Sequence, residues 1–325
     1  MLRTTFLRRP IRILSPERGA ALVVVALLMP ALAGVMALVV DVGQGYETRR
    51  QLQNGADAAA LAGAAYLPEH PSDAIAAAVD YAGRNGVTIS SEDVLISETY
   101  VADDTIRVNA DRNLNYSFAR VLGFMSGDVT ARAKVIVGTM GGGTGLMPWA
   151  LFPPDYVYGD PVTLKYAPGF NEGGNFGPLA IDGTGASVYR DTIVHGCRRL
   201  IRVGDYVDTE TGDMVGPTKQ GLRDHIGSDS TTFAQAVSMD GNGNMSILLP
   251  DCPRLIIVPV IKELPSGGRQ DVMIEGFAQV FITDFGGGGN NSWVKAIFVR
   301  VLNPEAVWTP IGESDYGMRI PKLIE

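Results

Sequence analysis

Few side chains in this sequence have the types and spacing that metal sites require. The three histidines are His70, His195 and His225, and no two of them stand at the i, i+4 spacing of a helical zinc site. A zinc set of His195, His225 and a cysteine can be assembled only by assuming the fold. Exposed or hydrogen-bonded histidines are the simpler interpretation, so we expect no metal ligands.

Motifs for covalent catalysis are equally scarce. The G-x-S-x-G pattern that presents a nucleophilic serine is absent from the sequence. A Ser/His/Asp set cannot be located from composition alone, and no serine stands in a recognisable nucleophile context. We therefore expect no catalytic residues and no cofactor, which means that the protein is not expected to be an enzyme.

Two glycine-rich stretches resemble ligand-binding loops, but each lacks a required residue. Gly141–Gly145 has the glycines of a phosphate-binding loop without its lysine. Asp240–Asn244 begins like a calcium loop that would end at Asp251, but Met245 occupies the position that requires glycine. We interpret the first stretch as a flexible linker and the second as a β-turn.

The two cysteines, Cys197 and Cys252, could form one disulfide. The membrane topology argued below places both in an oxidising compartment, where pairing is favoured. Such a bridge would contribute on the order of 3–4 kcal/mol to stability. It also requires the two Cα atoms to lie within about 7 Å of each other.

The same chain contains a long apolar stretch near its N-terminal end. Residues 19–40 contain no charged side chain, and a helix of this length, at ~1.5 Å per residue, crosses the ~30 Å hydrocarbon core of a bilayer. We predict a transmembrane helix over residues 19–41, with Gly19, Pro30, Gly34 and Asp41 as its characteristic positions. A cleaved signal peptide is the alternative, although the run is long for one.

Charge predicts the orientation of this helix. Residues 1–18 carry five arginines and one glutamate, whereas the remaining residues are acidic overall. The positive-inside rule places the basic arm in the cytoplasm and the bulk of the chain in the periplasm or outside the cell. We expect the lipid bilayer as a partner, and the acidic outer part argues against nucleic acid.

Residues 42–67 continue as a helix with one face of small side chains. That face consists of Leu52, Ala56, Ala59, Ala60 and Gly63, which recur at helical spacing. Small side chains allow helices to approach closely. The face could serve partner membrane helices in a helix-mediated oligomer, or it could pack on the protein's own domain, and the sequence leaves both interpretations open.

The remaining chain predicts two further regions. Residues 68–140 contain a helix capped by Ser72, then strand, strand, helix and strand, which indicates a small α+β domain. Residues 146–325 alternate short apolar runs with turns, and contain one short helix near 217–226, which predicts an all-β, sandwich-like domain. The predicted fold class is therefore α+β, and its parts are a basic arm (1–18), a transmembrane helix (19–41), a stalk helix (42–67), a small α+β domain (68–140) and a β-rich extracytoplasmic domain (146–325).

One part of the sequence resembles a known family. The features are Arg18-Gly19 before the apolar run, Asp41-Val42-Gly43 after it, and the stretches 50–54 and 56–62. This segment resembles the N-terminal segment of TadE/TadG-like proteins of the Flp (tight-adherence) pilus-assembly family. The resemblance covers about 48 residues and marks a membrane anchor rather than an activity.

The resemblance implies a single-pass protein of the bacterial cytoplasmic (inner) membrane with a role in Tad/Flp pilus assembly or secretion. Its partners would be other pilus-assembly or envelope proteins. Val24 replaces the glutamate that prepilin processing requires after Gly19, so we expect an uncleaved anchor. The D-x-S-x-S metal motif of some family members is absent. A membrane-anchored surface adhesin or binding module is one alternative function, and a membrane-tethered enzyme is the other.

Overall fold

The computed structural model describes residues 16–325, apart from 153–157, 166–176, 241–244, 264, 266–267, 288–291, 303–306 and 312–315. The chain folds as two compact units. The first contains the chain up to Asn54 together with Ala110–Ala131, and the second contains Gly55–Asn109 together with Arg132–Glu325.

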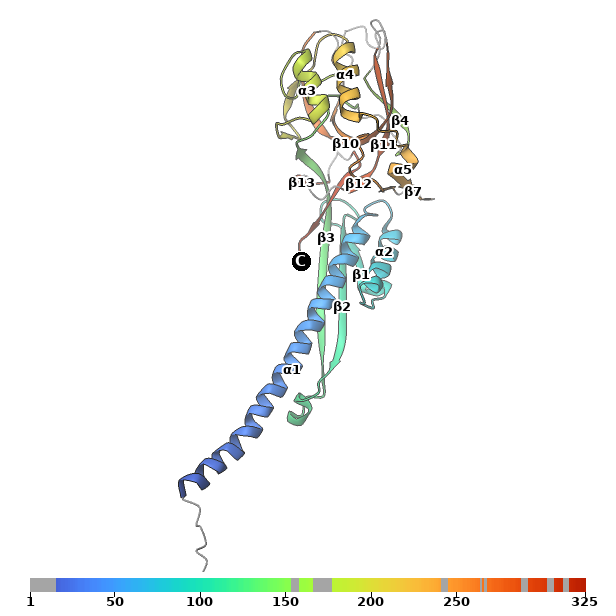
Figure 1. Ribbon diagram of the computed structural model, residues 1–325. Coiled ribbons are helices and arrows are strands. Elements are labelled where there is room, and N and C mark those ends of the chain that lie inside the picture. The colour runs from blue at the N-terminus through green and yellow to red at the C-terminus, as the bar shows by residue number, and fades with distance from the viewer. Residues whose placement is uncertain are drawn as a thin grey trace, which may run out of the picture. The chain divides into compact units, whose positions relative to one another are not determined.

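The helix α1 (Pro16–Ala64) is a single continuous element (Figure 1). It includes the whole predicted transmembrane stretch and nearly all of the predicted stalk, so the two are one helix. Pro30 lies inside it. The alanine, leucine and valine side chains of this segment offer no polar competitor for the backbone hydrogen bonds.

The first unit also contains the far ends of β2 (Thr105–Asn115) and β3 (Ser126–Gly143), which are neighbours in one sheet. The connection between them holds η2 (Ala119–Leu122), a single 3₁₀ turn where the sequence predicts a short helix. Gly123 ends this turn with φ of 92°, a left-handed conformation that glycine adopts at little cost.

The second unit begins with the end of α1, α2 (Pro71–Arg84), η1 (Ser91–Asp93) and β1 (Val94–Ser97). The predicted N-cap of α2, Ser72, is wrong: His70 is the cap residue, and the helix starts at Pro71. A proline suits the first turn because its φ is already helical and its missing N–H has no partner there.

The larger sheet has seven strands in the order β1-β2-β3-β14-β12, with β13 and β5 also paired to β3. The new strands are β5 (Ile201–Arg202), β12 (Val301–Leu302), β13 (Val307–Pro310) and β14 (Met318–Leu323). The predicted linker at 141–145 is wrong, because Gly142 and Gly143 pair with β5 at the end of β3. A Cβ on Gly142 would lie 2.8 Å from the Ile201 carbonyl oxygen, so glycine permits the close approach of these strands.

The smaller sheet has five strands. They are β4 (Pro161–Lys165), β11 (Trp293–Val299), β10 (Asp271–Gly286) and β6 (Tyr206–Asp208) in that order, with β9 (Leu255–Ile261) also paired to β10. Every pairing in it is antiparallel. Apolar runs in the sequence also predict strands at 255–261 and 272–282 and a third at 293–302 that forms a hairpin with the second. The first two strands are confirmed as β9 and β10, and the hairpin is confirmed between β10 and β11. The third strand ends earlier than predicted, because β11 stops at Val299 and residues 301–302 form β12 of the larger sheet.

The second unit also contains three helices, α3 (Ala186–His195), α4 (Val215–Ile226) and α5 (Phe233–Ala236). A separate two-stranded sheet is formed by β7 (Val237–Met239) and β8 (Met245–Ile247). The helix predicted near 217–226 is confirmed as α4, whereas α3 is a helix where the sequence predicts only β structure. Val188, Thr192, Ile193 and Val194 are β-branched and weak helix formers. Burial of Tyr189 and Ile193 against the sheet stabilises α3.

The main core of the second unit lies between these helices and the smaller sheet. Tyr189 and Ile193 of α3 and Leu222 of α4 join one buried cluster with Val258 of β9 and Val280 of β10. The molecule therefore has an α+β fold with a long apolar N-terminal helix, as the sequence predicts.

Candidate functional site

The most unusual surface of the molecule is the N-terminal half of α1. Its leucine, valine and methionine side chains point outward, and Leu22 and Leu27 each expose 71% of their surface. This is the one helix in the described part of the chain that is long and apolar enough to cross a membrane, and its most apolar stretch is not buried against the rest of the protein. Such a surface is unfavourable in water and matches a hydrocarbon solvent.

Asp41, the residue at which the apolar run ends, is buried inside the first unit. It exposes only 3% of its surface. Its carboxylate accepts hydrogen bonds from the backbone N–H groups of Ser117 (2.9 Å), Phe118 (2.8 Å) and Ala119 (2.6 Å). We call this arrangement of Asp41 with residues 117–119 the Asp41 latch. The carboxylate provides an acceptor for backbone N–H groups at the start of a 3₁₀ turn. In return, these N–H groups replace the water molecules that would otherwise solvate the buried carboxylate.

Further contacts continue from the latch along the helix. The Arg112 guanidinium donates to the Gln51 side-chain oxygen at 2.8 Å. A Cβ built on Gly45 would lie 3.9 Å from Leu114 Cδ2, which is van der Waals distance. Within the first unit, the end of β2 therefore runs alongside α1 in the opposite direction.

The anchor residues predicted from sequence all lie on α1. Gly34 has open space around it, since a Cβ there would meet no atom within 4 Å. Asp41, in contrast to Gly34, contacts another segment of the chain through the three hydrogen bonds just described. Sequence reasoning assigns Asp41 to the end of the helix but misses those partners, which stand 76 to 78 positions later in the chain.

The small-residue face of α1 is covered by its own chain. Leu52, Ala56, Ala59 and Ala60 are at most 1% exposed. A Cβ on Gly63 would clash with Ile106 Cδ1 and lie 2.8 Å from the Ala74 carbonyl oxygen, so β2 and α2 pack directly against that glycine within the second unit. Of the two interpretations that the sequence leaves open, the structure favours packing on the protein's own domain.

The same stretch of chain carries the match to known proteins. Residues 19–65 match the family described as "Putative Flp pilus-assembly TadE/G-like". The N-terminal segment of this chain is Tad-like. No curated protein and no solved structure matches the chain. The Tad-like segment contains the anchor, Asp41 and the small-residue face.

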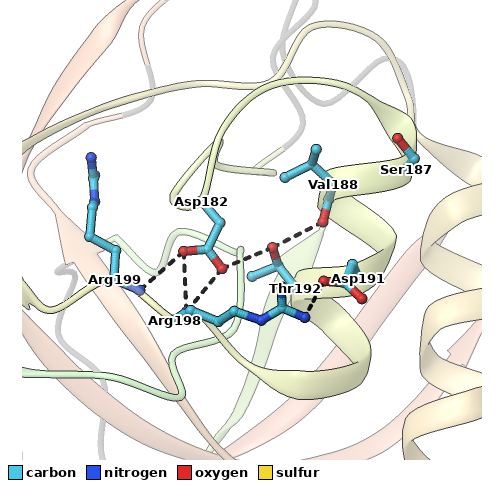
Figure 2. Close-up of a pocket in the computed structure, with 7 residues that line it drawn as sticks. All are labelled: Asp182, Ser187, Val188, Asp191, Thr192, Arg198 and Arg199. Atoms are coloured by element: carbon cyan, nitrogen blue, oxygen red, sulfur yellow. Dashed lines mark hydrogen bonds and ion pairs between the residues drawn. The ribbon is translucent and has the colours of Figure 1, made fainter.

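In the second unit, a cavity of about 590 Å³ lies beside α3 (Figure 2). Its lining residues are Asp182, Ser187, Val188, Asp191, Thr192, Arg198 and Arg199. The Asp182 carboxylate accepts the backbone N–H of Arg198 at 3.0 Å and of Arg199 at 3.2 Å, while the Arg198 guanidinium pairs with Asp191 at 2.8 Å. These carboxylates are engaged in holding the turn, so the lining does not form an acid–base pair around a reactive group.

Two of the three histidines, His195 and His225, make structural contacts. The ring nitrogens of His225 lie 3.1 Å and 2.9 Å from the carbonyl oxygens of Val194 and Pro253, and His195 Nδ1 lies 3.1 Å from the Asp191 carboxylate. No group of three His, Cys, Asp or Glu side chains that could hold a metal occurs among the described residues. Residues 241–244 of the calcium-like motif lie outside the described residues.

Lys165 is a fully buried cation with a neighbouring acid. Its Nζ lies 2.7 Å from Asp213 Oδ1 and 3.3 Å from the Ser292 carbonyl oxygen. Burial lowers the pKa of Lys165, and the hydrogen bond to Asp213 opposes that shift. The ammonium group has no exposed surface, so we interpret the pair as a structural tie between β4 and the chain before α4.

The predicted disulfide is not formed. Cys197 and Cys252 are both buried and free, and each packs within a different hydrophobic cluster. The Cys197 thiol donates to the Arg199 carbonyl oxygen at 3.2 Å. Burial raises the pKa of this thiol, so its reactive thiolate form is suppressed in the folded protein.

Proposed function

We propose that this protein is a single-pass component of the cytoplasmic membrane that contributes to Tad/Flp pilus assembly or secretion through protein–protein contacts. The observation that carries the proposal is the coincidence of two features over the same residues. The exposed apolar helix is long and apolar enough for a bilayer, and residues 19–65 match the Tad family.

The orientation in this proposal places the N-terminus in the cytoplasm. The five arginines before the apolar run support it, because basic flanks are retained on the cytoplasmic side. The second unit then lies in the periplasm or outside the cell. A reporter enzyme that works only beyond the membrane should be active when fused after Glu325 and inactive when fused before residue 1. The reverse pattern would contradict the orientation.

The proposed action is binding rather than catalysis. The two carboxylates of the α3 cavity are already hydrogen-bonded, Asp182 to the backbone of Arg198 and Arg199 and Asp191 to the Arg198 side chain, and the Lys165 ammonium is buried against Asp213. The partners on this proposal are other pilus-assembly or envelope proteins, which would dock on the second unit while the anchor holds it at the membrane.

A genetic experiment tests the role. Deletion of the gene in its source bacterium should abolish surface Flp pili, and the full chain should restore them. A version without residues 1–40 but exported by a cleavable signal should fail to restore them, because the domain would no longer be tethered. Normal piliation in the deletion strain would refute the proposed function.

A further inference from the structure

The turn between β2 and β3 carries apolar side chains that lie exposed. Phe118, Phe124 and Met125 expose 46%, 63% and 63% of their surface. Single exposed apolar side chains are common, but three within eight positions of one turn form a patch that calls for a partner. We call this turn, residues 116–125, the hairpin tip.

The contacts along α1 establish where the hairpin tip lies. Arg112 meets Gln51, Leu114 lies beside Gly45, and the backbone at 117–119 binds Asp41. Each step along β2 therefore moves towards the N-terminus of α1. The hairpin tip lies level with Asp41, where the uncharged run of residues 19–40 ends.

The geometry of the hairpin tip holds these side chains in place. The Phe124 N–H donates to the Ala119 carbonyl oxygen at 3.1 Å, and the Tyr116 N–H donates to the Met125 carbonyl oxygen, also at 3.1 Å. The Asp41 latch fixes the other end of the turn. The exposed apolar groups are thus presented by a closed, hydrogen-bonded loop.

We propose that the hairpin tip inserts into the lipid interface of the membrane that holds the anchor, on the side where Asp41 emerges. This inference rests on the anchor of the proposed function. A lipid surface is the occupant favoured here because the patch continues the exposed apolar surface of α1 at the level where the hydrocarbon core ends. Tyr46, which is 71% exposed one turn beyond Asp41, is an aromatic of the type enriched at this depth.

The polar groups of the hairpin tip suit the same environment. Asp41 would be costly at a membrane boundary if its carboxylate were unsatisfied, and the latch supplies it with three donors. Arg120 is exposed on the turn, where a guanidinium can meet lipid phosphates. Insertion of the hairpin tip would give the first unit a second attachment to the membrane beside the anchor. Two attachments would restrict rotation of the first unit about the long axis of α1.

Site-specific fluorescence tests the inference on the full chain in lipid vesicles. Four variants, Phe124→Cys, Ser126→Cys, Asp111→Cys and Leu32→Cys, each carry one environment-sensitive label, and the parent chain gives the background from its native cysteines. The quencher is a nitroxide placed near the lipid headgroup or along the acyl chain. Asp111→Cys is the matched control, because it lies on β2 five residues before the hairpin tip, about 17 Å away at ~3.3 Å per residue.

We expect a blue-shifted emission and several-fold stronger quenching at positions 124 and 126 than at 111. Ser126→Cys keeps all three apolar side chains, so quenching at position 124 alone would be an effect of the label and would overturn the inference. If the labels at positions 124 and 126 were quenched no more than the label at 111, while the label at 32 was quenched, the inference would be overturned and the anchor would stand. An unquenched label at position 32 would instead refute the anchor and the proposed function.

Discussion

The two units of this protein treat apolar and charged side chains in opposite ways. In the second unit, apolar groups such as Trp149 and Val280 are fully buried. In the first unit, the apolar groups of α1 lie outside, and a carboxylate, Asp41, is buried within. A core formed in water has the first arrangement. The exposed apolar surface of α1 suits apolar surroundings, so the comparison fits a lipid environment for residues 20–40 and water around the second unit.

The largest expected effect tests this difference directly. Trp149→Ala removes a fully buried indole and its hydrogen bond to the Tyr189 hydroxyl, and should lower the free energy of unfolding of the second unit by about 3–5 kcal/mol. Leu27→Ala truncates an exposed side chain and should change that quantity by less than ~0.5 kcal/mol. Denaturant unfolding in detergent micelles measures both. Equal losses would show that the two environments do not differ.

Two glycines of the same helix should respond differently to one substitution. Gly63→Ala places a Cβ 2.8 Å from the Ala74 carbonyl oxygen and should cost about 1–3 kcal/mol through overpacking. Gly34→Ala meets open space and should be neutral or slightly stabilising, because alanine favours helix by up to ~1 kcal/mol. Thermal unfolding of the two variants in the same detergent compares them. A loss at position 34 as large as that at 63 would indicate an additional contact there.

An ion-pair cluster of the second unit provides a contrast with the latch. Glu69 pairs with Arg300 and with Arg319, which is 1% exposed. Glu69→Gln removes the negative charge from both pairs while keeping the shape of the side chain. It should lower stability by roughly 1–3 kcal/mol, below the usual range for a buried pair because Glu69 itself is partly exposed. Glu92→Gln, at an exposed position, is the control and should have no measurable effect on denaturant unfolding.

Removal of the Asp41 carboxylate should act locally. Asp41→Ala leaves the N–H groups of residues 117–119 without their acceptor, and their amide hydrogen exchange should accelerate. Glu47→Ala, on an exposed position of the same helix, should leave that exchange unchanged. Exchange measured by mass spectrometry over peptides 110–131 distinguishes them, and unaltered protection in Asp41→Ala would show that the latch is not formed in solution.

The smallest expected effect concerns the cysteines. Denatured, unreduced protein should show two free thiols, and the folded protein should react slowly because both are buried and the pKa of Cys197 is raised by burial. Cys252→Ala should lose only the packing of a small side chain, about 1 kcal/mol, rather than the 2–5 kcal/mol of a lost disulfide. A thiol count of zero would restore the disulfide hypothesis.

The sequence by itself determines the anchor, the fold class and several strands of this protein. The uncharged run at 19–40, the apolar run at 255–261 and the alternation in 272–282 are local patterns, and local patterns can be read from the sequence without knowledge of the fold. The Tad resemblance is equally local, because it depends on a contiguous stretch of about 48 residues.

Only the tertiary structure decides how distant residues meet. The partners of Asp41, the cover over Gly63, the helix α3 and the strand role of Gly142 all depend on segments far away in the chain. The disulfide prediction fails for the same reason: two cysteines and an oxidising compartment permit a bridge, but the packing of each thiol into its own cluster keeps both free. Sequence patterns specify which side chains seek burial, whereas the fold specifies what they are buried against.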